Sequence, residues 1–219
     1  MTDDAKAVIA ARAAQELRPG EIVNLGIGIP NLIPGLLGEG ANVFLHTENG
    51  LLGVGPRPGE DELDPDLIDA AKRPVTALPG AAYFDSAQSF AMIRGGHIDV
   101  AVLGGLEVSE EGDLANWYLP ERGGGSIGGA MDLAVGAKRL IVAMSHATRD
   151  GRPRIRRRCE YPLTARAVVD LIVTDLAVIE VRPDGLLLTE VAPGVDPAFV
   201  EARTEPALRR SPNLREMEL

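Results

Sequence analysis

Short runs of apolar residues alternate along the chain with segments in which apolar residues recur every three or four positions. Such short runs, bounded by turn residues, are typical of buried strands, and the longer spacing is typical of helices. In the first helical segment Val8, Ile9 and Ala13 share one face, and Asp3 or Asp4 can cap its start. The pattern predicts strands at 21–27, 42–47, 75–78, 98–103, 140–144 and 176–181, and helices at 4–17, 31–37, 86–93, 130–137 and 165–173.

This alternation of strands and helices predicts an α/β fold built on an open, largely parallel sheet with helices on both faces. No composition break separates two halves, so we expect a single domain over residues 1–219, with 205–219 as a peripheral tail. The Pro-, Gly- and acid-rich segment 55–65 indicates a loop. The basic run 152–158 indicates a solvated hairpin arm or an edge strand.

Composition and charge exclude several function classes. The 219 residues include 22 Lys and Arg against 32 Asp and Glu, for a net charge of −10, which argues against a nucleic-acid surface. Cys159 is the single cysteine, so the chain forms no internal disulfide and no site built on several cysteines. The acidic N-terminus and the absence of a long apolar run predict a cytoplasmic protein without membrane association.

Three glycine-rich segments follow predicted strands or open predicted helices. The first, 24–30, contains Asn24, Gly26 and Gly28, whose backbone flexibility permits close approach to a ligand. One interpretation is a phosphate-bearing ligand at the start of the next helix, and the other is a tight strand–helix turn. It lacks the third glycine of a dinucleotide-binding fingerprint.

The second segment, 46–56, places Glu48 at the end of an apolar strand, followed by Asn49, Gly50 and further small or apolar residues. Such surroundings can partly desolvate the carboxylate. A carboxylate there can act as a base or as a nucleophile, and the spacing alone does not choose between them.

The third segment, 123–132, has a glycine cluster at the start of a predicted helix and includes Gly128 and Gly129. Its backbone N–H groups can stabilise a developing oxyanion, although the same composition fits a flexible surface loop.

The histidines and the cysteine suggest structural roles first. His46 can orient Glu48 if the strand continues that far, but a hydrogen-bonded structural histidine is the simpler interpretation. The dispersed histidines predict no metal site. Cys159 fits a small buried side chain better than a reactive thiol.

The chain resembles the B (beta) subunit of the family I 3-oxoacid CoA-transferases from Asn24 to about Gly194. Each matching motif is weak alone, but their order along the chain is specific. The motifs are 24–30 (NLGIGIP), 48–56 (ENGLLGVGP), 66–72 (DLIDAAK), 89–97 (SFAMIRGGH), 112–117 (GDLANW), 128–133 (GGAMDL) and 161–164 (YPLT).

The resemblance implies a CoA-transferase, NagB/RpiA-like fold and a ping-pong exchange of CoA without a further cofactor. Glu48 falls on the family's nucleophile, which forms a glutamyl-CoA thioester, and the Gly129 amide falls on one oxyanion donor. Asn24 would contact CoA or shape the site, and the remaining expected substrate- or CoA-binding residues are Gly26, Gly28, Asn49, Gly50 and Gly128. The second oxyanion donor would come from a partner A (alpha) subunit in a hetero-oligomer such as A2B2, so this chain alone should be inactive.

The same resemblance implies succinyl-CoA as donor and acetoacetate or 3-oxoadipate as acceptor. Thr47 stands where the family usually has Ser, and segments 116–122 and 126–127 depart from the usual pattern, which leaves the acceptor acid open. An acyl-CoA hydrolase on the same fold and a non-catalytic partner subunit are the alternative hypotheses.

Overall fold

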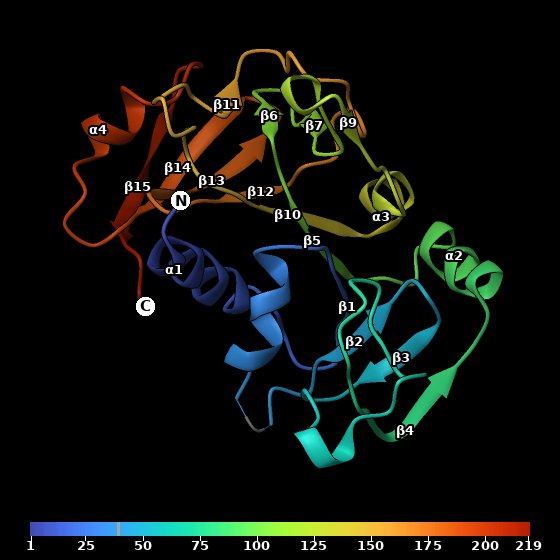
Figure 1. Cartoon of the computed structure of the whole chain (residues 1–219). Helices are drawn as coiled ribbons and strands as arrows, with labels where there is room; N and C mark the ends of the chain where they lie inside the picture. The colour runs from blue at the N-terminus through green and yellow to red at the C-terminus, as the bar shows by residue number, and fades with distance from the viewer. Residues whose placement is uncertain (39) are drawn as a thin grey trace.

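The computed structural model describes residues 1–38 and 40–219. Within this part of the chain one mixed ten-stranded sheet has the order β15–β14–β13–β12–β10–β5–β1–β2–β3–β4 (Figure 1). Its strands are β1 Ile22–Leu25, β2 Phe44–Thr47, β3 Leu51–Val54, β4 Ala77–Tyr83, β5 Val100–Gly104, β10 Arg139–Ala143, β12 Leu171–Val173, β13 Ala177–Arg182, β14 Gly185–Val191 and β15 Arg209–Glu216.

The helices and two small sheets complete the described fold. The α-helices are α1 Asp3–Ala14, α2 Ser86–Arg94, α3 Ala130–Gly136 and α4 Pro197–Glu201, and the 3₁₀ segments are η1 Pro30–Leu36, η2 Glu60–Glu62 and η3 Pro120–Arg122. Strands β6 Glu107–Ser109, β7 Leu114–Ala115 and β11 Ile155–Arg156 form one small sheet, and β8 Tyr118–Leu119 pairs with β9 Gly124–Gly125.

The centre of the large sheet is parallel, and its flanks are mixed. Neighbours β12, β10, β5, β1 and β2 pair in parallel, which confirms the predicted parallel core. Strands β3 and β4 on one side and β13 and β14 on the other add antiparallel pairs. Short connections account for three of these four antiparallel pairs, since the few residues 48–50, 174–176 and 183–184 can link only antiparallel neighbours.

Helices cover both faces of the sheet, as the sequence predicts (Figure 1). On one face, Ile9 of α1 packs with Val100 and Val102 of β5. On the other face, helices α2 and α3 pack against Leu103 of the same strand, with Leu133 among the contacts. Alternate residues of β5 therefore enter opposite cores, as expected for a strand buried on both sides.

Two local predictions are wrong. Residues 165–173 do not form a helix, because Ala167 adopts a left-handed backbone (φ 49°) and Leu171–Val173 form the central strand β12 beside β10. Residues 30–36 form a 3₁₀ segment in place of an α-helix, with Pro34 inside it. Proline lacks the N–H that an α-helical ladder needs at that position.

The ends of the sequence pack more closely than predicted. Thr2, one residue before the expected caps, accepts the capping hydrogen bond from the Ala5 amide. The segment expected to be a peripheral tail instead contributes the edge strand β15, and Met217 beyond it is buried. Strand β11 lies at the edge of its small sheet, which confirms the edge-strand interpretation of 152–158.

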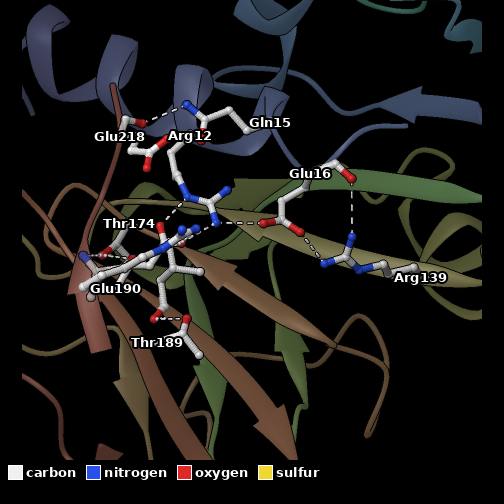
Figure 2. Close-up of polar contacts among 11 residues, drawn as sticks. Arg12, Gln15, Glu16, Arg139, Thr174, Thr189, Glu190 and Glu218 are labelled. Atoms are coloured by element: carbon white, nitrogen blue, oxygen red, sulfur yellow. Dashed lines mark hydrogen bonds and ion pairs between the residues drawn. The ribbon is translucent and has the colours of Figure 1, made fainter. Parts of the chain in front are cut away.

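A buried ionic cluster joins α1 to the sheet (Figure 2). The guanidinium of Arg12 bonds Glu190 of β14 at 2.5 Å and Glu16 at 2.8 Å, and Glu16 also pairs with Arg139 of β10. Arg215 of β15 completes the cluster with a 2.8 Å contact to Glu190. The Arg12 and Glu190 side chains are only 7% and 5% exposed, so their charges must compensate each other.

This cluster predicts acid sensitivity. Burial tends to raise the pKa of Glu190, but the hydrogen bonds from Arg12 and Arg215 outweigh it and hold the pKa below its ordinary value of 4.5. A carboxyl whose pKa is lowered in the fold stabilises it above the unfolded-state pKa, and this contribution disappears as the pH falls through the folded-state pKa. We therefore expect the free energy of unfolding to fall as the pH decreases from about 5 to 3.

Urea unfolding between pH 7 and pH 3 measures this dependence. Other carboxyls also titrate in this range, so the comparison that matters is with Glu190→Gln, whose pH dependence should be shallower. Identical slopes for the two proteins would contradict the assignment to this cluster.

Candidate functional site

The candidate site lies where the carboxyl ends of neighbouring parallel strands β5, β1 and β2 meet. In open α/β sheets this edge is where ligands bind. A cavity of about 340 Å³ opens there and is lined by Glu48 after β2, by Gly26 and Ile27 after β1, and by Gly104 at the end of β5. The loop before α3 closes another side of the cavity with residues 126–130.

The turn that carries Glu48 is held by its neighbours. Thr47 donates its hydroxyl to Asn49 Oδ1 at 2.6 Å, and Asn49 Nδ2 donates to the Ile68 carbonyl at 2.8 Å. Gly50 has φ +126°, and a side chain there would collide with the carbonyl oxygen of Phe84. The conformation therefore needs glycine at position 50, and it leaves Glu48 half-buried at the cavity wall.

Asn24 connects Glu48 to a buried histidine. Its Nδ2 lies 3.3 Å from Glu48 Oε2 and 3.1 Å from His46 Nδ1, and its side chain is fully buried. On the other edge of the ring, His46 Nε2 lies 3.1 Å from Ser89 Oγ. Burial lowers the pKa of His46 to about 4, so the ring is neutral near pH 7.

The Gly128–Gly129 backbone lies beside Glu48 in the wall of the cavity. A Cβ built on Gly129 would lie 3.6 Å from Glu48 Cγ and 3.1 Å from the Phe90 ring, so only a residue without a side chain fits comfortably. Gly128 has φ +50°, which turns the chain into α3. This geometry places a backbone segment beside the carboxylate, as an oxyanion site requires.

The structure brings together some of the residues expected from the sequence. Glu48, Gly26, Gly128 and Gly129 line one cavity, and Asn24 contacts Glu48 directly. The other three expected residues, Gly28, Asn49 and Gly50, do not line the cavity. Asn49 and Gly50 instead shape the turn that carries Glu48.

Sequence reasoning gave no role to two polar residues of the site. Asn116 lines the cavity and donates to the Gly104 carbonyl at 3.0 Å, and Ser89 contacts His46 from helix α2. Both belong to motifs of the family resemblance, which is the one signal that could have singled them out. Ser126 and Ile127, where the sequence departs from the family pattern, also face the cavity.

Other chemically reactive side chains have structural surroundings. Burial raises the pKa of the Cys159 thiol to about 12, so it stays protonated near pH 7. His146 is fully buried between the hydroxyls of Thr174 and Thr204, each 2.9 Å from a ring nitrogen. Within residues 1–38 and 40–219 we find no group of three side chains suited to hold a metal ion, and no helix long and apolar enough to cross a membrane.

Comparison with known proteins decides the family. The model of the family described as Coenzyme A transferase matches residues 6–202. This chain belongs to the Coenzyme A transferase family. The beta subunit of the acetate CoA-transferase of Escherichia coli strain K12 is 52% identical over 202 residues, covering 92% of both chains.

Other members of the family extend this picture. The B subunit of the 3-oxoadipate CoA-transferase of Pseudomonas putida strain KT2440 is 51% identical over 86% of this chain and 88% of its own length. The human mitochondrial succinyl-CoA:3-ketoacid coenzyme A transferase 2 is 47% identical over 99% of this chain, which matches 42% of the human protein.

Solved structures support the fold. The acyl-CoA transferase YdiF apoenzyme of Escherichia coli O157:H7 superposes with a TM-score of 0.79 at 23% identity, over the whole of this chain and 44% of that chain. The present chain therefore spans less than half the length of this structural relative. The family assignment and the fold agree with the expectations from the sequence.

Proposed function

We propose that this chain is the B (beta) component of a two-subunit 3-oxoacid CoA-transferase. In this proposal CoA passes from an acyl-CoA, expected to be succinyl-CoA, to acetoacetate or 3-oxoadipate. The observation that carries the proposal is the position of Glu48 beside the Gly128–Gly129 backbone in a cavity at the carboxyl edge of the sheet. The 3-ketoacid and 3-oxoadipate substrates named for relatives at about 50% identity support the substrate class.

The chemistry follows from a carboxylate that faces a thioester. A Glu48 oxygen attacks the acyl carbon, the C–S bond breaks, and an acyl-glutamyl anhydride and CoA thiolate form. The thiolate then attacks the Glu48 carbonyl, which releases the first carboxylic acid and leaves a glutamyl-CoA thioester. The incoming 3-oxoacid carboxylate reverses both steps and leaves as its CoA thioester.

Each step forms a tetrahedral oxyanion that needs hydrogen-bond donors. Gly129 lines the cavity beside Glu48, so we assign its amide as one donor, and the partner A (alpha) subunit would supply the other. Ile27 at the cavity wall is 70% exposed, so a partner subunit could bury this apolar side chain and close the cavity. A covered cavity excludes water, which would otherwise hydrolyse the thioester.

The net charge of −10 limits how this chain can bind CoA. CoA is an anion, so its recognition must use backbone amides and local cationic groups more than the overall field. The glycines at 26 and 128 let the backbone approach the ligand closely at the cavity. We assign no further cofactor, because the exchange needs only the carboxylate and the two substrates.

Activity of the reconstituted complex tests the proposal. The chain is expressed with the A-type subunit of the same organism, and CoA transfer from succinyl-CoA is measured with acetoacetate, 3-oxoadipate, acetate and water as acceptors. We expect exchange with a 3-oxoacid, little hydrolysis, and no activity from this chain alone. If CoA thioester is hydrolysed by water as fast as CoA is transferred to the acids, the proposal is contradicted and a hydrolase is favoured. If no thioester is consumed at all, a non-catalytic role is favoured.

A further inference from the structure

Ser89, His46, Asn24 and Glu48 form a chain of hydrogen-bonding groups that starts at helix α2 and ends at the cavity. Ser89 Oγ on α2 contacts His46 Nε2, His46 Nδ1 contacts Asn24 Nδ2, and Asn24 Nδ2 contacts Glu48 Oε2, at 3.1, 3.1 and 3.3 Å. Ser89 and Asn24 are fully buried and His46 is 4% exposed, so the contacts among these three residues are shielded from water.

The contact with Glu48 shows which end of the Asn24 amide carries the nitrogen. In the observed orientation the NH₂ group faces both the carboxylate and the His46 ring, and the buried Oδ1 has no partner within the described residues. The reversed amide would place Oδ1 about where Nδ2 lies, against the Glu48 carboxylate, and two acceptors would then face each other. The amide therefore donates toward Glu48 even though Oδ1 remains unsatisfied.

This orientation identifies the tautomer of His46. Because Asn24 donates, His46 Nδ1 must be the unprotonated acceptor, and a neutral ring then carries its proton on Nε2 and donates it to Ser89 Oγ. The ring is held in its plane by Phe84, which stacks on it with centroids 5.8 Å apart and an interplanar angle of 14°. Desolvation by burial keeps the ring neutral, and a proton on Nδ1 would turn the Asn24 donor away from Glu48.

We propose that His46 is a positioning residue that, as the neutral Nε2–H tautomer, orients the Asn24 amide and through it the Glu48 carboxylate for attack. The proposal rests on the proposed function, because it assigns His46 to the nucleophile of that reaction. His46 does not line the cavity that holds Glu48; it lines a neighbouring cavity of about 350 Å³, and its contact toward Glu48 runs through Asn24. Without the acceptor at Nδ1 the Asn24 amide can rotate, and the carboxylate loses the contact that fixes its rotamer.

A pair of substitutions separates this role from simple packing. His46→Leu keeps an apolar volume but removes both ring nitrogens, and His46→Gln keeps one acceptor for Asn24 and one donor for Ser89. In the complex with the A-type subunit we expect His46→Leu to lower kcat about 10- to 100-fold, because small displacements of reacting groups have effects of this size. The KM for acyl-CoA should change less than twofold, and His46→Gln should recover most of kcat.

A double-mutant comparison keeps the test decisive if His46→Leu also lowers the melting temperature. Because His46 acts through Asn24, adding His46→Leu to Asn24→Ala should cause little further loss of kcat. The proposal is overturned if His46→Leu retains wild-type kcat, if its loss appears only in KM, if His46→Gln is as impaired as His46→Leu, or if the two losses multiply in the double variant.

The failure of this proposal and the failure of the proposed function give different results. If the wild-type complex does not exchange CoA, or if Glu48→Gln retains full exchange, the proposed function itself is contradicted. If exchange occurs and requires Glu48 while the His46 variants give one of the overturning results, only the positioning role is lost.

Discussion

Replacing Glu48 by Gln should lower the rate of CoA exchange by about 10⁴-fold or more, because the carboxamide is a far weaker nucleophile than the carboxylate. The substitution preserves the shape of the side chain, and its carboxamide oxygen can still accept the hydrogen bond from Asn24. Glu48 is half-buried at the cavity wall, so the fold itself should be little affected. The measurement is kcat of the reconstituted complex, with circular dichroism and the melting temperature as evidence of folding.

The matched control for this substitution is Glu110→Gln, which removes the same charge from an exposed position after strand β6. Its exchange rate should stay within twofold of the wild type. A Glu48→Gln complex that exchanges CoA as fast as the Glu110→Gln complex would contradict the assignment of Glu48 as nucleophile.

Replacing Arg12 by Met should lower the free energy of unfolding by about 3–5 kcal/mol. The change leaves Glu190 buried with only Arg215 beside it, and removes one of the two cations that contact Glu16 (Figure 2). A buried carboxylate without enough compensation costs far more than the methionine gains by packing. Urea denaturation at pH 7 measures the loss.

Two further variants identify the cause. Arg182→Met removes a surface pair with Glu180, whose side chains are 47% and 37% exposed, and should cost under about 1 kcal/mol. Adding Glu190→Leu to Arg12→Met removes the uncompensated charge and should restore part of the stability. If Arg12→Met cost no more than Arg182→Met, the buried cluster would not hold α1 and the sheet together.

The sequence was sufficient to predict the parts of the fold that depend on local patterns. The apolar runs that became β1, β2, β5 and β10 each contain at least one β-branched residue and are bounded by turn residues, so their strands were predictable. Strand β12 was not, because its three residues follow a segment whose apolar spacing also fits a helix. Its pairing with β10 on one side and β13 on the other, after the left-handed Ala167, determines its state.

The site, too, has a part that local motifs indicate and a part that only the folded structure shows. Glu48 and Gly129 could be singled out as candidates because each lies in a glycine-rich motif, yet they are 81 positions apart in the sequence, and only the folded sheet edge shows them adjacent. The contacts of His46 with Asn24 and Ser89 join residues 22 and 43 positions apart. Such contacts depend on the order β1–β2 and on the packing of α2, which no single-sequence pattern encodes.

The most direct test of the central claim is mass spectrometry of the complex after brief incubation with succinyl-CoA. The account predicts a CoA thioester on the peptide that contains Glu48, and hydroxylamine should convert that carboxyl, and no other, to a hydroxamate. The Glu48→Gln complex should carry neither modification. Modification at another carboxyl would contradict the covalent role assigned to Glu48. A complex that exchanges CoA but carries no modification at Glu48 would contradict it as well.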